Sequence, residues 1–216
     1  MKKIYFVRHG ATGGNEKDEF QLPTIPLSDM GLKQAEFVAE RFKTIPVDTI
    51  IASDMKRASQ TAEAISKTLN KKITYQALFQ EILRPSFVRG KRKDDPEVMK
   101  IMEEVKANFD NQNYHHSDEE NYFDLKNRAV KCLEYLQSLQ EENILVVTHG
   151  QFLNMLIGIM ELGDTMTPKQ FKLLQKFFIA KNTGITIVEE YKGNFFLLTW
   201  NDYTHLGDTD IKYIPS

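Results

Sequence analysis

The sequence predicts an α/β fold, and three apolar segments carry that prediction. Residues 3–7, 48–53 and 143–149 are short runs rich in β-branched residues, and a helical pattern follows each of them. Uninterrupted apolar strands that alternate with helices are typical of a mainly parallel sheet covered on both faces. We therefore expect a three-layer α/β/α sandwich with a mainly parallel central sheet.

Three further segments extend the expected sheet. Residues 184–191 and 194–200 are separated by Lys192 and Gly193 only, and this spacing predicts a β-hairpin. Residues 71–75 have a weaker apolar pattern that also favours a strand.

Capping residues indicate where several helices begin. Ser28 is placed to cap an amphipathic helix that must end before Pro46. Ser53 or Asp54 is the expected cap of the helical pattern in residues 55–69. Patterns of the same kind predict three further helices, over residues 96–109, 122–140 and 150–162.

The composition restricts the partners and the compartment. The 216 residues include 28 basic and 30 acidic side chains, and this balance gives no general attraction to nucleic acid or to anionic membranes. Cys132 is the only cysteine, which excludes an intramolecular disulfide and favours a buried, inert thiol in a reducing compartment. No apolar stretch is long enough to span a bilayer, and Arg8 interrupts the first apolar run before it could serve as a signal peptide. We expect a cytoplasmic protein.

No repeat, low-complexity tract or linker divides the chain, so we expect one domain over residues 1–216. The least regular segments are residues 80–95 and 110–121. Long irregular segments in a compact domain are often functional. We therefore expect a cap-like insertion around residues 80–120 that covers a site.

Polar side chains follow three of the expected strands. Each of two strands ends in a histidine followed by a glycine that lets backbone approach closely, namely His9 with Gly10 and His149 with Gly150. Ligands bind at this end of open parallel sheets. Arg8 lies beside the first histidine, and Arg57 lies in the helix after the strand at residues 48–53. Together with the two histidines, these arginines predict a receptor for a compact anion. Phosphate is the expected anion, because arginine forks and helix N-termini both bind it well.

These residues belong to a longer ordered set that runs through most of the chain. It comprises Arg8-His9-Gly10 with Thr12 and Asn15, Leu27-Ser28, Gly31, Gln34-Ala35, Ser53-Asp54, Arg57-Ala58, Thr61-Ala62 and Thr148-His149-Gly150. The set resembles the histidine phosphatase superfamily, also called phosphoglycerate-mutase-like. The resemblance implies an α/β/α sandwich, phosphoryl transfer, and no required metal or other cofactor.

The resemblance also implies a role for each matching residue. His9 would be the nucleophile that becomes phosphorylated. The phosphoryl oxygens would be held by Arg8, Arg57 and His149, with Asn15 and Thr12 assisting at the rim and the backbone at Gly150 close by.

A carboxylic acid is needed as well, because the leaving oxygen must receive a proton. Glu81 stands where the family usually supplies a glutamate as general acid, and its carboxylate would then activate water. An unperturbed glutamate titrates near about 4.3, which favours acidic conditions unless the site raises that value. Asp54 is an alternative acid, but its expected place at a helix start also suits a cap, so we prefer Glu81.

Other uses of the histidines are weaker hypotheses. A zinc site would require cysteine or carboxylate ligands at a recognisable spacing, and the sequence shows none. His115 and His116 lie in a polar segment that favours solvation. His205 is close to the C-terminal end of the sequence, where a packing role is expected.

The substrate is less well defined. Phosphoglycerate mutases resemble one another just after their acid glutamate, and residues 82–87 depart from that pattern, so we favour hydrolysis of a small phosphorylated metabolite over mutase activity. Arg84, Arg89 and Phe87 would suit such a substrate. The basic run at residues 89–93 is typical of a solvated face, but it could bind a second anionic group of the substrate if the segment folds over the pocket. The sequence leaves open the ester, the breadth of specificity, a homodimer, and a non-catalytic module that binds phosphate esters.

Overall fold

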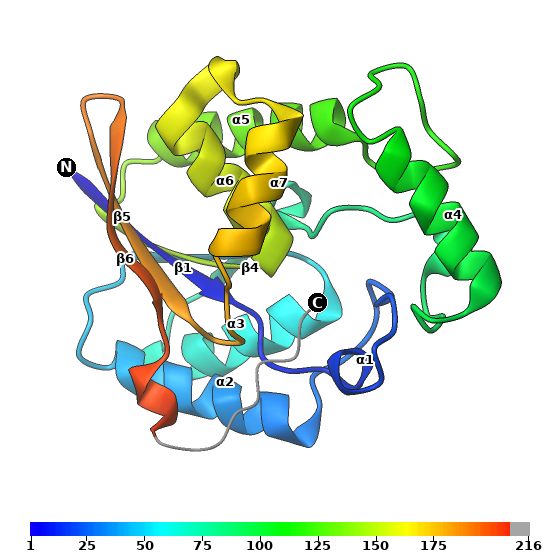
Figure 1. Ribbon diagram of the computed structural model, residues 1–216. Helices are drawn as coiled ribbons and strands as arrows, with labels where there is room; N and C mark the ends of the chain where they lie inside the picture. Colours follow the sequence, from blue (N-terminus) through cyan, green and yellow to red (C-terminus); the bar gives the residue numbers. More distant parts are fainter. Residues whose placement is uncertain (208–216) are drawn as a thin grey trace.

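The computed structural model describes residues 1–207, in which a six-stranded mixed sheet lies between two layers of helices (Figure 1). Four strands run parallel, and a C-terminal hairpin continues the sheet beside β1. The strand order is β3 (Ile73–Tyr75), β2 (Thr49–Ala52), β4 (Asn143–Thr148), β1 (Lys2–Arg8), β5 (Ile185–Tyr191) and β6 (Asn194–Asp202). This order confirms the α/β/α sandwich and all six predicted strands.

The register of the two central strands determines where the polar residues lie. Arg8 is opposite Thr148 in the parallel pair of β1 and β4, so His9 and His149 leave the sheet at the same edge. Side chains alternate along β1: Tyr5 and Val7 join the core on one face, whereas residues 4 and 6 join the core on the other.

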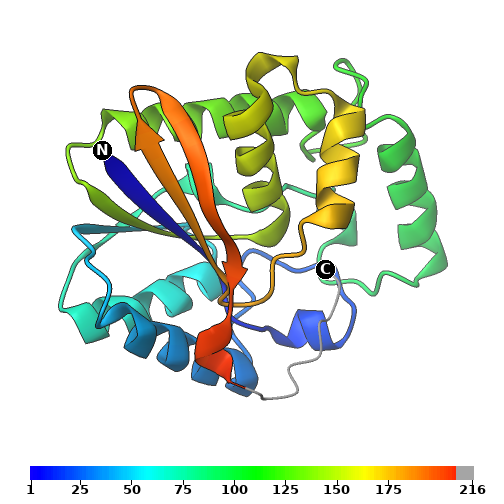
Figure 2. The ribbon, with the colours of Figure 1, turned by 60° about the vertical axis from the view of Figure 1, so that its left-hand side comes forward.

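Helices from different parts of the chain cover the two faces of the sheet, as Figure 2 shows. Helices α2 (Asp29–Phe42) and α3 (Lys56–Leu69) pack on one face. On the other face lie α5 (Tyr122–Ser138), α6 (Gly150–Leu162) and α7 (Pro168–Phe177). Cys132 on α5 is buried as expected, and burial raises the pKa of its thiol to about 12.

Two helix starts differ in how well the sequence indicated them. Ser28 caps α2 as predicted, because its side chain accepts a hydrogen bond from the Gly31 amide. The expected cap of α3 is wrong: Met55 is the N-cap residue and makes no side-chain capping bond. Ser53 lies two residues before the N-cap residue, and its hydroxyl accepts a hydrogen bond from the Met55 amide.

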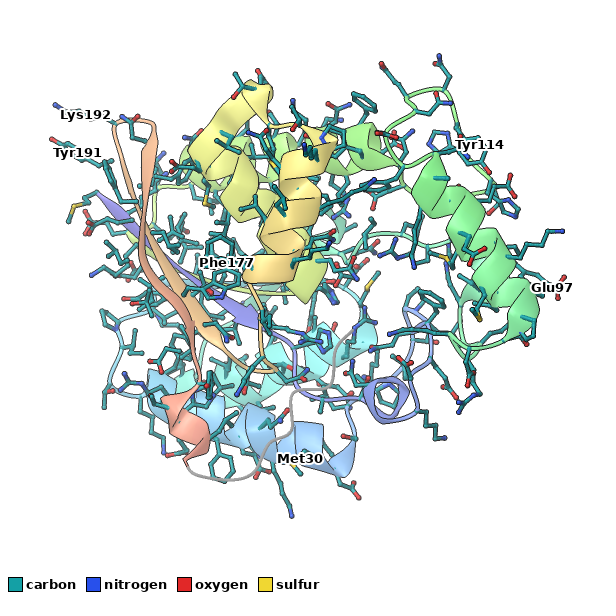
Figure 3. All side chains as sticks on the ribbon, viewed as in Figure 1. Met30, Glu97, Tyr114, Phe177, Tyr191 and Lys192 are labelled. Carbon is teal, nitrogen blue, oxygen red and sulfur yellow. The ribbon has the colours of Figure 1, made fainter. Side chains whose placement is uncertain are left out.

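Helix α7 was not predicted, although its start carries a capping signal. The Thr167 hydroxyl accepts a bond from the backbone of Gln170, the Gln170 side chain accepts one from Thr167, and Pro168 occupies the first helical turn. The β5–β6 turn behaves as expected, because Lys192 and Gly193 have positive φ values of 51° and 83°. Figure 3 shows Lys192 at the outer tip of this hairpin.

Residues 80–121, here called the insertion, leave the sheet after β3 and return at α5. They include α4 (Pro96–Ala107), which lies outside the two helical layers and on the same side of the molecule as α1 (Gly13–Glu16) in Figure 1. The insertion has a small apolar cluster of its own, made by Val88, Val98, Met102 and Val105. Backbone bonds join it to the segment after α1, as from the Phe20 amide to the Lys91 carbonyl over 2.9 Å.

Among the helices of residues 1–207, none has both the length and the apolar composition needed to cross a bilayer.

Candidate active site

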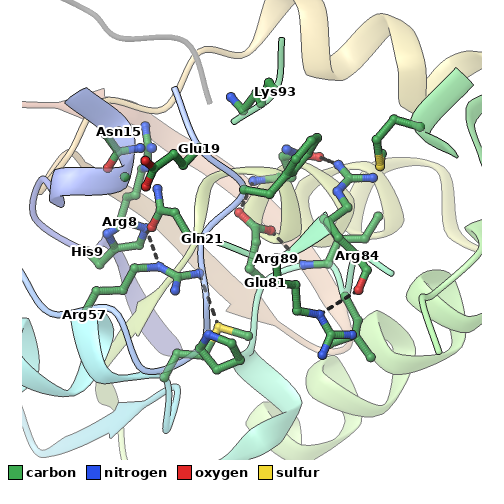
Figure 4. Close-up of a pocket in the computed structure, with 18 of the residues that line it drawn as sticks. Arg8, His9, Asn15, Glu19, Gln21, Arg57, Glu81, Arg84, Arg89 and Lys93 are labelled. Atoms are coloured by element: carbon green, nitrogen blue, oxygen red, sulfur yellow. Dashed lines mark hydrogen bonds between the residues drawn. The ribbon is translucent and has the colours of Figure 1, made fainter. Parts of the chain in front are cut away.

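A cavity of about 210 Å³ lies where the predicted site residues meet. The strand ends and α3 form one wall, and the insertion forms the opposite wall (Figure 4). Its lining includes Arg8, His9, Asn15, Arg57, Glu81, Arg84, Arg89, Lys93, Lys106 and Gln151.

His9 is held in one tautomer. Its Nδ1 lies 2.7 Å from the Gly10 carbonyl oxygen, which only accepts, so Nδ1 carries the proton and Nε2 presents a lone pair. The Arg57 Nε–H donates to this Nε2 over 3.2 Å. Burial lowers the pKa of His9 well below its usual value, and the nearby charges of Arg57 and Arg8 lower it further. The ring is therefore neutral at neutral pH.

Arg57 is a buried cation, only 4% exposed. Its other hydrogen-bond partners among the described residues are neutral, since it donates to the Leu22 carbonyl over 3.2 Å and to the Met55 sulfur. Burial lowers the pKa of Arg57 to about 10, although the charge of Glu81 acts in the opposite direction. Among the described residues no carboxylate forms an ion pair with Arg57, so its charge is available to an anion.

Arg8 is also buried and approaches the start of α6. Its Nη1 donates to the Ala180 carbonyl over 2.5 Å. A Cβ at Gly150 would be in ordinary van der Waals contact with the Arg8 side chain, 3.4 Å from its Nε, so the start of α6 lies directly against this guanidinium. The backbone of Arg8 is fixed as well, because its carbonyl accepts from the Thr183 amide. Asn182 completes the frame by donating to the His9 carbonyl over 2.8 Å.

His149 lies directly against His9, with the ring centroids 5.0 Å apart. Its Nε2 is 2.9 Å from the Ser53 hydroxyl, and its buried Nδ1 has no hydrogen-bond partner in the described part of the chain. The side chain is fully buried and does not belong to the cavity lining. Burial, followed by the charge of Arg57, lowers the pKa of His149 well below its usual value.

Glu81 reaches the strand ends because its carboxylate binds the start of α6. It accepts backbone bonds from Phe152 over 2.9 Å and from Gln151 over 3.2 Å. His149, the N-cap residue, provides no side-chain cap, so Glu81 caps this helix from another part of the chain. The same carboxylate lines the cavity.

An ion pair on α5 holds the segment that carries Glu81. Arg128 pairs with Glu120 over 2.6 Å and also donates to the carbonyls of Leu78 and Gln80, each over 2.8 Å. Glu120 in turn accepts from the Leu83 amide. The backbone on both sides of Glu81 is thus attached to α5.

Some predicted contacts are placed differently by the structure. Thr12 is fully buried and outside the cavity lining, so it does not lie at the rim as expected; its hydroxyl donates to Asn15 over 3.0 Å and positions that residue. Phe87 also lies outside the lining, with the Lys91 ammonium 3.0 Å from its ring centroid. Asp54 lies outside it too and accepts a bond from Gln80.

The basic residues of the insertion differ in whether a carboxylate already neutralises their charge. Arg84 donates to the neutral amide oxygen of Gln151 over 2.6 Å. Arg89 and Lys93 line the cavity, but Asp118 pairs with Arg89 and Asp18 with Lys93. The remaining histidines lie elsewhere: His115 binds Asp124, His116 lies near Glu104, and His205 lies 3.1 Å from the Thr183 hydroxyl.

Several residues of the cavity lining were not predicted from the sequence. Lys106 and Gln151 are examples, and Glu19 is an acidic one. A helical pattern does place Lys106 one turn after the buried Met102, but that spacing alone does not indicate a cavity. Within residues 1–207, no group of three or more His, Cys, Asp or Glu side chains is placed to hold a metal ion.

Known proteins are similar to this chain in sequence and in fold. Residues 4–203 match the family model described as histidine phosphatase superfamily (branch 1). PhoE of Bacillus subtilis, an uncharacterized phosphatase, is 30% identical over 166 residues, which cover 76% of this chain and 80% of that protein. The solved structure of YhfR from Bacillus stearothermophilus has a TM-score of 0.81 at 24% identity and covers 95% of this chain and 100% of that chain. A mutant phosphoserine phosphatase from Entamoeba histolytica, in complex with phosphoserine, has a TM-score of 0.71 at 25% identity, with coverage of 95% and 100%.

Proposed function

Because the chain belongs to branch 1 of the histidine phosphatase superfamily and is a phosphatase of that branch, we propose that it hydrolyses a phosphomonoester through a phosphohistidine on His9, without a metal ion. The observation that carries this proposal is the orientation of His9. Its proton is on Nδ1, bound to the Gly10 carbonyl, so the Nε2 lone pair faces the cavity side occupied by Arg57. A neutral imidazole with a fixed lone pair is an activated nucleophile.

In the first step the Nε2 lone pair forms a bond to phosphorus as the bond to the ester oxygen breaks. The Arg57 Nε–H, which binds Nε2 in the free protein, turns to a phosphoryl oxygen when the substrate binds. Arg8 and Arg57 then stabilise the charge that spreads over the equatorial oxygens. His149, which lies outside the cavity lining, packs its ring against His9 and helps to hold the orientation of that ring.

Glu81 supplies the proton in this step. In its protonated form it donates to the leaving oxygen, so an alcohol departs and a carboxylate remains. In the second step that carboxylate takes a proton from water, the water oxygen attacks phosphorus, and the bond to His9 breaks to release phosphate. Its place on the cavity wall, fixed by the start of α6 and by Arg128, supports both roles.

The cavity supports a small substrate. Its volume of about 210 Å³ is below the range of roughly 300–1,000 Å³ that is typical of drug-sized ligands. The Entamoeba relative binds phosphoserine, an ester of this size. We therefore infer that the substrate is a small phosphorylated metabolite and that the chain works as one domain with the insertion as its cover.

Hydrolysis of p-nitrophenyl phosphate in the presence of a chelator tests this function. We expect turnover by the intact protein and a loss on the order of a thousandfold or more in His9→Asn. The matched control is His116→Asn, since that ring lies in the insertion and outside the cavity lining. A trapped, acid-labile phosphoryl group on His9, seen by mass spectrometry, would support the intermediate. Turnover that stops on chelation, or that persists in His9→Asn, would refute the proposal.

A further inference from the structure

A second cavity of about 280 Å³ adjoins the first. The two cavities share four lining residues, namely Arg8, Arg84, Lys106 and Gln151. The hydrogen bond from Arg84 to Gln151 therefore lies at their junction. Helices α6 and α7 and residues 178–180 form the remaining wall of the second cavity.

The charges of the second cavity are all of one sign. Three of its lining residues are basic, and none is acidic; the basic ones are Arg8, Arg84 and Lys106. The first cavity, by contrast, includes the carboxylates of Glu19 and Glu81. Lys106 forms no ion pair with any residue in the described part of the chain, so its ammonium is free to bind an anion.

Amide groups in the same cavity add hydrogen-bonding capacity. Asn154 is only 5% exposed, and its Oδ1 has no hydrogen-bond partner among residues 1–207. A buried polar atom without a partner is costly, so such an atom on a cavity wall points to a ligand or water that completes it. Gln175, which donates to Gln151 over 3.2 Å, places a further amide there.

We propose that the second cavity binds a second anionic group, a carboxylate or a phosphate, on the leaving portion of the substrate. This proposal rests on the proposed phosphatase function and extends it to the substrate class. The phosphoryl group occupies the first cavity between His9 and Arg57, and the leaving portion extends past Arg84. Lys106 then binds the second anion, while Asn154 and Gln175 bind its neighbouring polar groups.

Two matched pairs of esters test the proposal with the whole protein. 3-Phosphoglycerate and glycerol 3-phosphate differ in a carboxylate, and fructose 1,6-bisphosphate and fructose 6-phosphate differ in a phosphate. We expect kcat/KM to be at least about tenfold higher for the doubly anionic member of one pair. That pair identifies which anion the second cavity binds.

The variant Lys106→Gln should reduce this preference about tenfold, and Lys106→Glu should reduce it further by repulsion. Lys100→Gln is the matched control, because Lys100 is an exposed residue of α4 outside both cavities, and it should keep the wild-type preference. Equal kcat/KM values within both pairs, or an unchanged preference in Lys106→Glu, would overturn the second site alone. No hydrolysis of these four esters or of p-nitrophenyl phosphate would overturn the proposed function.

Discussion

The strand ends and the insertion face each other across the cavity, and they are built differently. At the strand ends, His9 and Arg57 are almost fully buried; the register of β1 with β4 places His9 beside His149, whereas Arg57 lies in the first turn of α3, after β2. The insertion contributes Arg84, Arg89 and Lys106 from a segment with a small apolar cluster and partly exposed ion pairs. From this comparison we expect the reaction chemistry to depend on the buried strand ends and the selectivity to depend on the insertion, which can vary at little cost to the core.

Glu81 shows where the boundary between these regions lies. It is at the start of the insertion in the sequence, yet its carboxylate binds the first turn of α6 and its backbone is held by Arg128. The proposed acid is therefore held in place by the helices that cover the sheet and not by the rest of the insertion. We expect substitutions at Glu81 to behave like those at the strand ends.

Of the substitutions outside His9, removal of the buried cation should have the largest effect. In Arg57→Met, kcat/KM should fall on the order of a hundred- to a thousandfold, because a fixed donor to the phosphoryl oxygens is lost. The melting temperature should stay level or rise, since Arg57 is a buried charge without an ion-pair partner in the described residues and a methionine of similar length removes that cost. Enzyme kinetics and thermal unfolding measure the two effects. The matched control is Lys56→Met on the exposed side of the same helix, and a large loss of stability in Arg57→Met would contradict the interpretation.

Glu81→Gln should have the next largest effect, and the effect should depend on the leaving group. Hydrolysis of an alkyl phosphate should slow about a hundredfold, because the departing alkoxide needs a proton. Hydrolysis of p-nitrophenyl phosphate should slow much less, because nitrophenolate leaves without one. Comparing kcat for the two esters measures this difference. Equal losses on both would assign Glu81 to capping α6 and not to proton transfer.

The sequence predicted the strand-end part of the site better than the part formed by the insertion. Strand periodicity and the glycines after His9 and His149 predict neighbouring strand ends, because such signals are local. The position of Glu81 followed only from a resemblance, since its partners, the Phe152 amide and the Arg128 guanidinium, lie about 70 and 47 residues away in the sequence.

The errors have the same physical origin. Thr12 and Phe87 were expected at the substrate, but local partners occupy both: a capping box with Asn15 and the Lys91 ammonium. Lys106 was not selected, because a lysine on an amphipathic helix gives no sign of what faces it across space. Tertiary contacts of the insertion therefore have to be observed and cannot be inferred from periodicity.

A pair of identical substitutions sharpens the comparison between the regions. Val146 in β4 and Val98 in α4 are both fully buried. Val146→Ala should lower the free energy of unfolding by about 2 kcal/mol, because the central core cannot relax. Val98→Ala should lower it by less than about 1 kcal/mol but should increase hydrogen exchange in α4, because its small cluster opens locally. Equal losses in urea unfolding with unchanged exchange in α4 would show that the insertion and the sheet unfold as one unit.

The smallest expected effect is a loss of folding stability at acidic pH. Burial lowers the pKa values of His9 and His149 in the folded protein, whereas in the unfolded chain they titrate near about 6.5. Below that pH the unfolded chain binds more protons, so each histidine should remove about 1.4 kcal/mol of stability at pH 5.5 relative to pH 7.5. In His149→Asn this acid loss should shrink by about that amount, whatever the variant's stability at pH 7.5, and His116→Asn in the insertion should leave it unchanged. Urea unfolding at the two pH values measures the loss, and equal losses in the two variants would contradict the prediction. If the loss shrinks in His149→Asn alone, the acid sensitivity is a direct consequence of keeping the imidazoles at the strand ends neutral. The neutral imidazole is the state in which His9 can attack phosphorus.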